Sequence, residues 1–464
     1  MSQPSTNPLR QVLDALGEEI EWIQYDGWGM HVPEGYFRFE VGPPEDSFEG
    51  VLRRLGGEAD VNAWRELTTK MRPLLKASAA IPPLALRGDR WAALTLAPYL
   101  AKALLSAGLG VQALQGAFTD VLEGTVPKGT FLYRWLDYLS FALSGLPADG
   151  TMAAAVIYTL GDMHRPGSVL DYPCGGAGAV IQAMIRGIDK LGGRVMLRSH
   201  VEEVLVEGGK AVGVRLRDGS VVRARRAVVS NASIWDTMRL LPAGSVPEEY
   251  VKASMATPDT GSFMHLHLGI DATGLEGLDI HYSVVEDWGK PIDAPQNMFI
   301  VSIPTVLDPT LAPEGKHLVH IYTAGNEPYS VWEGLRRGSP EYEALKKERG
   351  ECLWKALERI IPDIRARTEL ELVASPLTHE YYARRHKGSY GPGWQAGKDN
   401  FPGCVTPLPG LLHCGDSTLP GLGLPAVAAS GMNAASTLTP VWRQLSLLWE
   451  MKRKGFMRSQ FDDF

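Results

Sequence analysis

Residues 411–431 read LLHCGDSTLPGLGLPAVAASG, and this stretch decides the fold that the sequence predicts. The apolar run 411–414 is typical of a buried strand, and Gly415-Asp416 follows it directly. Small residues then lead to Pro425, a residue type that is favoured in the first turn of a helix. The stretch therefore predicts a strand, a glycine-containing loop and a helix that continues through Ala434.

The same residue types could bind a cofactor that carries hydroxyl groups. The side chain of Asp416, just past the strand end, can accept a hydrogen bond from a ribityl or ribose hydroxyl. Gly421 and Gly423 permit close approach of the backbone to a bulky ligand. The positive end of the helix after Pro425 can stabilise negative charge on a reduced flavin. On these residues alone, a purely structural turn is the alternative.

A second α/β segment precedes this one in the chain. The residues Cys174-Gly175-Gly176-Ala177-Gly178 lead into an apolar-periodic stretch that predicts a helix ending at Gly192-Gly193. Asp218-Gly219 is a strong hairpin signal. The run 227–232 is typical of a buried strand that enters a parallel sheet. Three short strands are expected between the helix and this run, at 201–206, 212–217 and 221–224.

Both segments resemble one family. Residues 411–431 resemble the C-terminal FAD signature of phytoene-desaturase-like flavoproteins, and residues 173–232 resemble the middle FAD segment of that family. The family includes carotenoid desaturases, prolycopene isomerases, retinol saturases and, more distantly, flavin amine oxidases. The resemblance covers most of the chain and implies FAD as the cofactor. It implies that the Val201 backbone contacts the adenine and that Asp416 holds the ribityl chain. The other FAD-binding positions that it implies are Gly415, Gly421, Gly423, Pro425, Ala426 and Val427.

One expected motif is missing. Dinucleotide binding usually needs G-x-G-x-x-G after a strand, within a βαβ unit of about 30 residues. The closest match, residues 175–178, lacks that spacing, and we expect it to follow Pro-Cys rather than a strand. Three accounts are open: the sequence is a fragment truncated at its N-terminus, a partner polypeptide completes the fold, or the protein no longer binds FAD.

The predicted fold class is α/β. We expect a discontinuous Rossmann-like FAD domain without its N-terminal βαβ unit, and an α+β substrate domain with a helical cap. The substrate domain should be an antiparallel sheet with strands near 263–270, 281–285, 298–303 and 318–322, followed by a helix over 341–361. The expected divisions are 1–43 (N-terminal remnant), 44–165 (helical cap), 166–243 (middle FAD segment), 244–402 (substrate domain) and 403–464 (C-terminal FAD segment).

The most apolar part of the expected cap is residues 91–118. Its longest uncharged run, 103–119, is slightly shorter than the roughly 18 residues of a membrane-spanning helix, and it contains glycines. We interpret it as an amphipathic lid or core helix pair. Peripheral contact with a membrane is one role for it, and ordinary core packing is the other.

Composition limits the remaining possibilities. The formal net charge of −7 offers no basic stripe for nucleic acid, so we expect no nucleic-acid partner. The 4 cysteines form no C-x-x-C pair, which favours reduced thiols.

His265 and His267 should share one face of a strand, but a metal site requires a third ligand and the sequence points to none, so we expect no metal. Residues 384–387 are interpreted as a solvated basic turn and 389–394 as cavity lining or core.

The resemblance implies flavin chemistry on a hydrophobic small molecule, namely desaturation, saturation or redox-neutral cis–trans isomerisation of a carotenoid-like or retinoid-like polyene. A flavin amine oxidase and a non-catalytic remnant are the alternatives. No catalytic side chain is predicted, because the flavin itself would carry the chemistry. The resemblance implies a plastid or membrane-associated location, and a reducing intracellular compartment is the alternative. The sequence does not set the oligomeric state.

Overall fold

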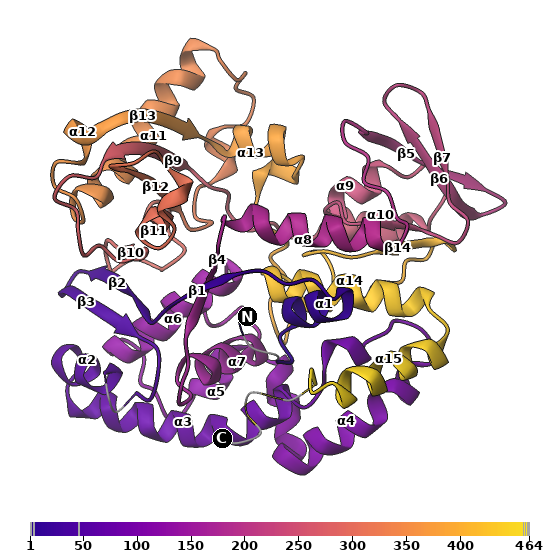
Figure 1. The fold of residues 1–464 in the computed structure, drawn as a ribbon, viewed down its shortest axis with the longest axis horizontal. Helices are drawn as coiled ribbons and strands as arrows, with labels where there is room; N and C mark the ends of the chain where they lie inside the picture. The colour runs from indigo at the N-terminus through magenta and orange to yellow at the C-terminus, as the bar shows by residue number, and fades with distance from the viewer. Residues whose placement is uncertain (1, 3–4, 45–46, 458, 460, 462–464) are drawn as a thin grey trace.

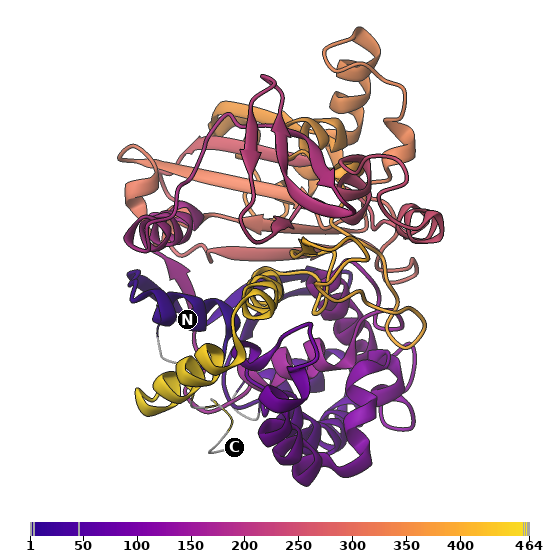
Figure 2. The same cartoon turned by 90° about the vertical axis from the view of Figure 1, so that its right-hand side faces the viewer.

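The computed structural model describes residues 2, 5–44, 47–457, 459 and 461. A mixed sheet with its helices lies above a helical region, and a smaller α/β region lies beside them (Figure 1). The turned view shows the sheet above and the helices below, with α14 between them (Figure 2). The protein is therefore an α/β protein, as the sequence predicts.

The large sheet has seven strands in the order β13-β9-β12-β11-β10-β2-β3. Leu266, Leu268 and Ile270 on β9 are buried against helix α11 (Pro340–Glu358), which covers one face. All neighbouring strands are antiparallel except β10 and β2, which are parallel. The strands are β2 (Gly27–Val32), β3 (Gly35–Glu40), β9 (His265–Asp271), β10 (His281–Val285), β11 (Met298–Ser302), β12 (Lys316–Thr323) and β13 (Thr368–Ala374).

The two segments expected to bind FAD come together in space. Strand β14 (Leu411–His413) pairs in parallel with β8 (Val228–Ser230). Helix α1 (Pro8–Leu16) packs on both α8 (Ala177–Lys190) and α14 (Leu424–Leu438). The other helices of these segments are α9 (Ile234–Arg239), α10 (Glu248–Met255) and α15 (Val441–Arg453). A separate antiparallel sheet consists of β5 (Val201–Glu207), β6 (Lys210–Leu216) and β7 (Val221–Arg223).

The helical cap has an aromatic core. Phe48, Trp64 and Trp135 are buried together with Phe39 of β3, and the Phe39 and Trp135 rings stack at 5.3 Å. Burial lowers the pKa of His164, whose ring lies among these aromatic rings, to about 4. The helices are α2 (Phe48–Leu55), α3 (Glu58–Ser78), α4 (Ala92–Ala107), α5 (Phe118–Leu122), α6 (Phe131–Ser144) and α7 (Ala153–Met163).

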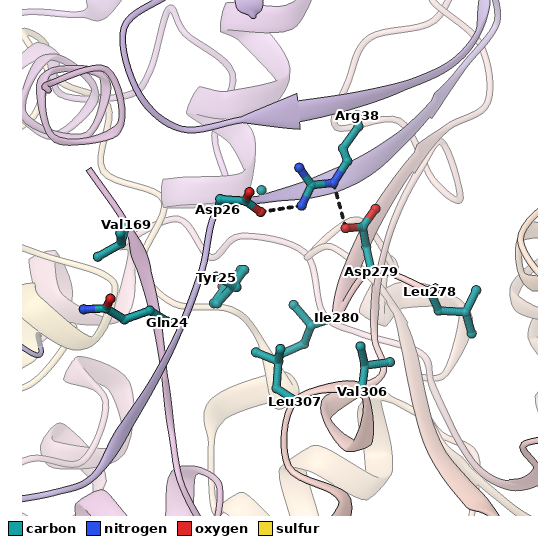
Figure 3. Close-up of a pocket in the computed structure, with 11 residues that line it drawn as sticks. Gln24, Tyr25, Asp26, Arg38, Val169, Leu278, Asp279, Ile280, Val306 and Leu307 are labelled. Atoms are coloured by element: carbon teal, nitrogen blue, oxygen red, sulfur yellow. Dashed lines mark hydrogen bonds and ion pairs between the residues drawn. The ribbon is translucent and has the colours of Figure 1, made fainter. Parts of the chain in front are cut away.

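A strand pair connects the regions. Strand β1 (Trp22–Tyr25) pairs antiparallel with β4 (Leu170–Pro173). Beside it lies a cavity of about 440 Å³, across which Arg38 of β3 forms ion pairs with Asp26 and Asp279 (Figure 3). Since both carboxylates already neutralise this guanidinium, we interpret the cavity as a structural junction.

Several sequence predictions are confirmed: the helical character of the expected cap, the parallel strand at 228–230 and the helix after the glycine loop. Three differ. A strand, β4, does precede Gly175, but it pairs antiparallel with β1 and so forms no βαβ unit. The large sheet is mixed, because β2 pairs in parallel with β10. After α4 the chain continues as a 3-10 helix, Gly108–Gln115. Across the described residues, we find no helix that combines the length and the apolar character needed to cross a bilayer.

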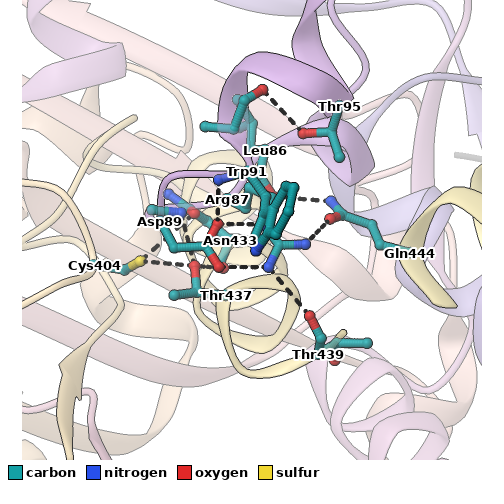
Figure 4. A network of polar contacts seen from close by, with 12 residues as sticks. Leu86, Arg87, Asp89, Trp91, Thr95, Cys404, Asn433, Thr437, Thr439 and Gln444 are labelled. Carbon is teal, nitrogen blue, oxygen red and sulfur yellow. Dashed lines mark hydrogen bonds and ion pairs between the residues drawn. The ribbon is translucent and has the colours of Figure 1, made fainter. Parts of the chain in front are cut away.

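Arg87 fixes α14 and α15 to the cap. Its buried guanidinium donates to both carboxylate oxygens of Asp89 at 2.6 Å and to Gln444 Oε1 at 2.7 Å (Figure 4). It also donates to the Thr439 carbonyl, just after α14, where a positive charge is favourable. The pKa of Asp89 is lowered by these hydrogen bonds.

We expect Arg87→Ala to lower the free energy of unfolding by about 3 kcal/mol, because it leaves the buried Gln444 oxygen without its partner and Asp89 without its counter-ion. Urea unfolding followed by tryptophan fluorescence measures the change. Arg90→Ala removes an exposed arginine nearby and should change the free energy by about 0.5 kcal/mol or less. Equal effects of the two substitutions would contradict this account.

Candidate cofactor site

The site begins where β14 and β8 end. Because the strands are parallel, the residues after His413 and after Ser230 leave the sheet at the same edge, which is where ligands bind in open α/β sheets. The Cys414 N–H donates to the Ser230 carbonyl at 2.9 Å. The buried His413 ring contacts the Ala232 carbonyl through Nε2 at 2.6 Å. Burial lowers the pKa of His413, so this ring is neutral at pH 7 and acts as a hydrogen-bond donor.

The loop after β14 is fastened to α14. The Gly415 N–H donates to Ser430 Oγ at 2.7 Å, and that hydroxyl donates to the Val427 carbonyl at 2.8 Å. Ser417 is fully buried; its hydroxyl donates to Asp416 Oδ1 at 3.1 Å and accepts from the Ile234 N–H. The position of Asp416 is therefore set from both sides of the loop.

Asp416 also forms an ion pair that the sequence did not reveal. Its Oδ2 lies 2.6 Å from Arg385 Nη1, and the Asp416 side chain is only 12% exposed. The same guanidinium donates to the carbonyls of Ser389 and Tyr390 at 3.0 and 2.9 Å. The Asp416 carboxylate is thus ordered, and a ligand hydroxyl would compete with or join Arg385 at this acceptor.

The remaining residues predicted to bind the cofactor lie in the loop before α14 and in the first turn of that helix. Gly415, Gly421 and Gly423 have φ values of 102°, 109° and 95°, a backbone region that favours glycine. No atom lies within 4 Å of the place where a Cβ on Gly423 would stand, and at Gly421 the nearest is Phe401 Cε1 at 3.9 Å. Pro425, Ala426 and Val427 form the first turn of α14. The turn leaves N–H groups without intrahelical partners, which favours negative charge there.

Val201 lies apart from this loop, as the first residue of β5. The preceding residue, His200, lines an open cavity of about 820 Å³. Its lining includes three arginines, Arg198, Arg217 and Arg384, together with Asp218, and Arg217 forms an ion pair with Glu202 at 2.8 Å. Val201 itself is not among the lining residues, and its contact with the adenine stays a prediction. Among the residues that the structure describes, no strand–helix–strand unit with parallel strands is available to cradle the pyrophosphate.

Three side chains of the basic turn 384–387 contact other residues, whereas the sequence analysis expected this turn to be solvated. Besides Arg385, Lys387 forms an ion pair with Asp259 at 2.9 Å, and the His386 ring stacks on Trp235 at 4.6 Å. Trp394 is buried against Trp235, which favours the core interpretation of its segment. The position of Arg385 was not predictable from the sequence, because its partner lies 31 residues further along the chain.

Comparison with known proteins identifies the family. Residues 123–439 match the model of the family described as flavin containing amine oxidoreductase. This match covers more than half of the chain, so the chain belongs to that family. FAD is the cofactor that this membership and the strand-end geometry support.

Two curated relatives illustrate the similarity. The chain is 34% identical over 314 residues to the chloroplastic prolycopene isomerase of Arabidopsis thaliana. The aligned region covers 66% of this chain and 52% of that protein. It is 30% identical over 289 residues to a neurosporene-forming phytoene desaturase of Cereibacter sphaeroides, which covers 56% of this chain and 52% of that protein. The chain therefore spans about half the length of the curated relatives it matches.

Solved structures show the same fold. An oxidoreductase from Methanosarcina mazei matches with a TM-score of 0.56 at 19% identity, over 93% of this chain and 85% of the other. A putrescine oxidase matches with a TM-score of 0.54 at 15% identity, again over 93% and 85%. At these identities the likeness concerns the fold alone.

We expect Asp416→Asn to weaken FAD binding about tenfold, because a neutral amide is a poorer acceptor than a carboxylate for the ligand hydroxyl. FAD titration followed by quenching of flavin fluorescence measures the dissociation constant. Asp293→Asn, at an exposed position before β11, is the matched control and should leave binding unchanged. Unchanged affinity of Asp416→Asn would remove Asp416 from the site.

Proposed function

We propose that this protein is an FAD-dependent enzyme that isomerises a hydrophobic poly-cis polyene of the carotenoid kind without net oxidation. The observation that carries the proposal is the strand-end loop 414–427 in a chain similar to prolycopene isomerases. The higher identity to these relatives than to the phytoene desaturase favours isomerisation over desaturation. The chloroplastic relatives support a plastid setting.

Bound FAD supplies a redox-active ring system, and the protein positions it. In this proposal Asp416 holds the ribityl hydroxyls, while Arg385 fixes the orientation of that carboxylate. The first turn of α14 stabilises negative charge at one edge of the flavin. No side chain needs to transfer a proton, which agrees with the absence of an acid–base pair among the described residues of the loop.

We further propose that a polypeptide segment other than the described residues binds the pyrophosphate. Large apolar side chains around α8 and the β8–β14 strand pair are exposed, which supports the proposal that another polypeptide segment covers them. Ile181 on α8 is 59% exposed, and Val229 on β8 and Leu424 at the start of α14 are 43% and 64% exposed. A segment of this chain or a partner polypeptide would bury these groups.

The activity test is anaerobic incubation of the purified protein with reduced FAD and a poly-cis carotene. We expect conversion to the all-trans isomer with an unchanged number of double bonds, measured by chromatography and mass spectrometry. A product with more or fewer double bonds would contradict isomerisation and favour desaturation or saturation. Peroxide formation from putrescine in air would favour the amine oxidase alternative, and no conversion of either substrate would favour a non-catalytic protein.

We also propose that helices α4 and α15 rest on a membrane from which the polyene enters. Both helices pack on the cluster around Leu84 and Leu448. Their outer residues define the α4–α15 surface, whose apolar members Leu105, Trp442 and Trp449 are 89%, 68% and 64% exposed. Tryptophan, leucine and basic residues together are typical of interfacial helices. The exposed basic residues beside this surface are Arg90, Lys102, Arg443, Lys452, Arg453 and Lys454.

The double substitution Trp442→Ser/Trp449→Ser should reduce binding to vesicles of galactolipid with anionic lipid about tenfold, since it removes two apolar anchors. Vesicle co-sedimentation measures the partition coefficient. Tyr382→Ser, at an aromatic that is 72% exposed on α13 (Pro376–Ala383), serves as the control and should have no effect. If the double variant binds vesicles as the unsubstituted protein does, this surface is not the membrane contact.

A further inference from the structure

Three histidines meet on the face of the large sheet that is turned away from α11. His265 and His267 lie two residues apart on β9, and their side chains therefore point to the same face. In the antiparallel pairing, His320 of β12 lies directly opposite His267. The intervening residue Leu266 points the other way, into the core beneath α11.

The rings lie close enough to share one ligand. The nitrogen atoms that the three side chains offer all lie within 4.8 Å of one another. His265 Nδ1 and His320 Nε2 are 2.6 Å apart, and the rings of His267 and His320 are parallel with centroids 4.2 Å apart. Three nitrogens around one zinc ion stand about 3.3 Å from each other at the usual bond length, so the stacked rings would turn toward one another when the ion binds.

The three rings are partly removed from water by the sheet and by α13. Burial lowers the pKa of His265 and of His267, and together with the neighbouring histidines it lowers the pKa of His320 to about 3. The groups that face the cluster are His379 of α13, whose pKa is also lowered, and the Tyr322 hydroxyl, whose pKa is raised by burial.

A second observation points to a missing partner. The buried Nε2 of His265 and the buried Nε2 of His379 each have no hydrogen-bond partner among the described residues, although the two rings are 4.4 Å apart. Leaving a buried polar nitrogen without a partner costs free energy. The expectation of no metal rested on the lack of a third ligand, and His320 removes that reason.

We propose that His265, His267 and His320 bind one divalent transition-metal ion of the zinc type. The site goes beyond the proposed flavin function, because none of its residues belongs to the strand-end loop. Two histidines on one strand and a third on its neighbour occupy three positions of a tetrahedron and leave the fourth position free. His267 is exposed, so water or a small ligand can reach this side of the cluster.

The test uses the full chain without an affinity tag, freed of metal by chelation. Zinc is titrated calorimetrically, and Co²⁺ serves as the spectroscopic probe. We expect one Zn²⁺ per chain, and with Co²⁺ a visible absorption band typical of four-coordinate geometry. His320→Gln and, separately, His267→Gln should weaken zinc binding about 100-fold.

His317→Gln is the matched control, because it removes a histidine from the same strand but from the opposite face. It should leave zinc affinity unchanged. Circular dichroism of each variant checks folding, and the Co²⁺ spectrum of the unsubstituted protein needs no variant at all. The proposal is overturned if that protein binds no stoichiometric zinc, or if His317→Gln weakens binding as much as His320→Gln does. Both results can be obtained whether or not the protein binds FAD.

Discussion

The parallel pairing of β14 with β8 is the constraint on which the candidate site depends. It brings two segments separated by about 180 residues to one sheet edge, and the hydrogen bonds of His413 with Ala232 and of Cys414 with Ser230 hold their ends in register. In this register the loop 415–423 connects the end of β14 with the beginning of α14 at the sheet edge. The ion pair of Asp416 with Arg385 then connects the loop to the turn that follows α13.

Much of this arrangement could be predicted from sequence because the signals are local. An apolar run that ends in Gly-Asp, glycines at positive φ and a proline in the first turn of a helix each have a physical reason within a few residues. Periodicity likewise predicted the cap helices and the helix α11. The strand pair around Asp218-Gly219 followed from turn chemistry.

What could not be predicted depends on contacts between distant parts of the chain. Hydropathy does not reveal that β2 would pair in parallel with β10, because strands of either orientation show similar patterns in a buried sheet. The strand β4 was missed because it is short and half-buried and pairs with β1 rather than with a neighbour in sequence. His320 lies 53 residues from His267, so their alignment across the sheet appears only in three dimensions.

The central claim is that residues 414–427 contact the cofactor. Hydrogen–deuterium exchange of the purified protein, with and without saturating FAD, tests this claim most directly. The account predicts slower exchange on FAD addition in peptides that cover 414–427, with no change in peptides from β12, 316–323. Unchanged exchange in 414–427 while FAD is bound would contradict it.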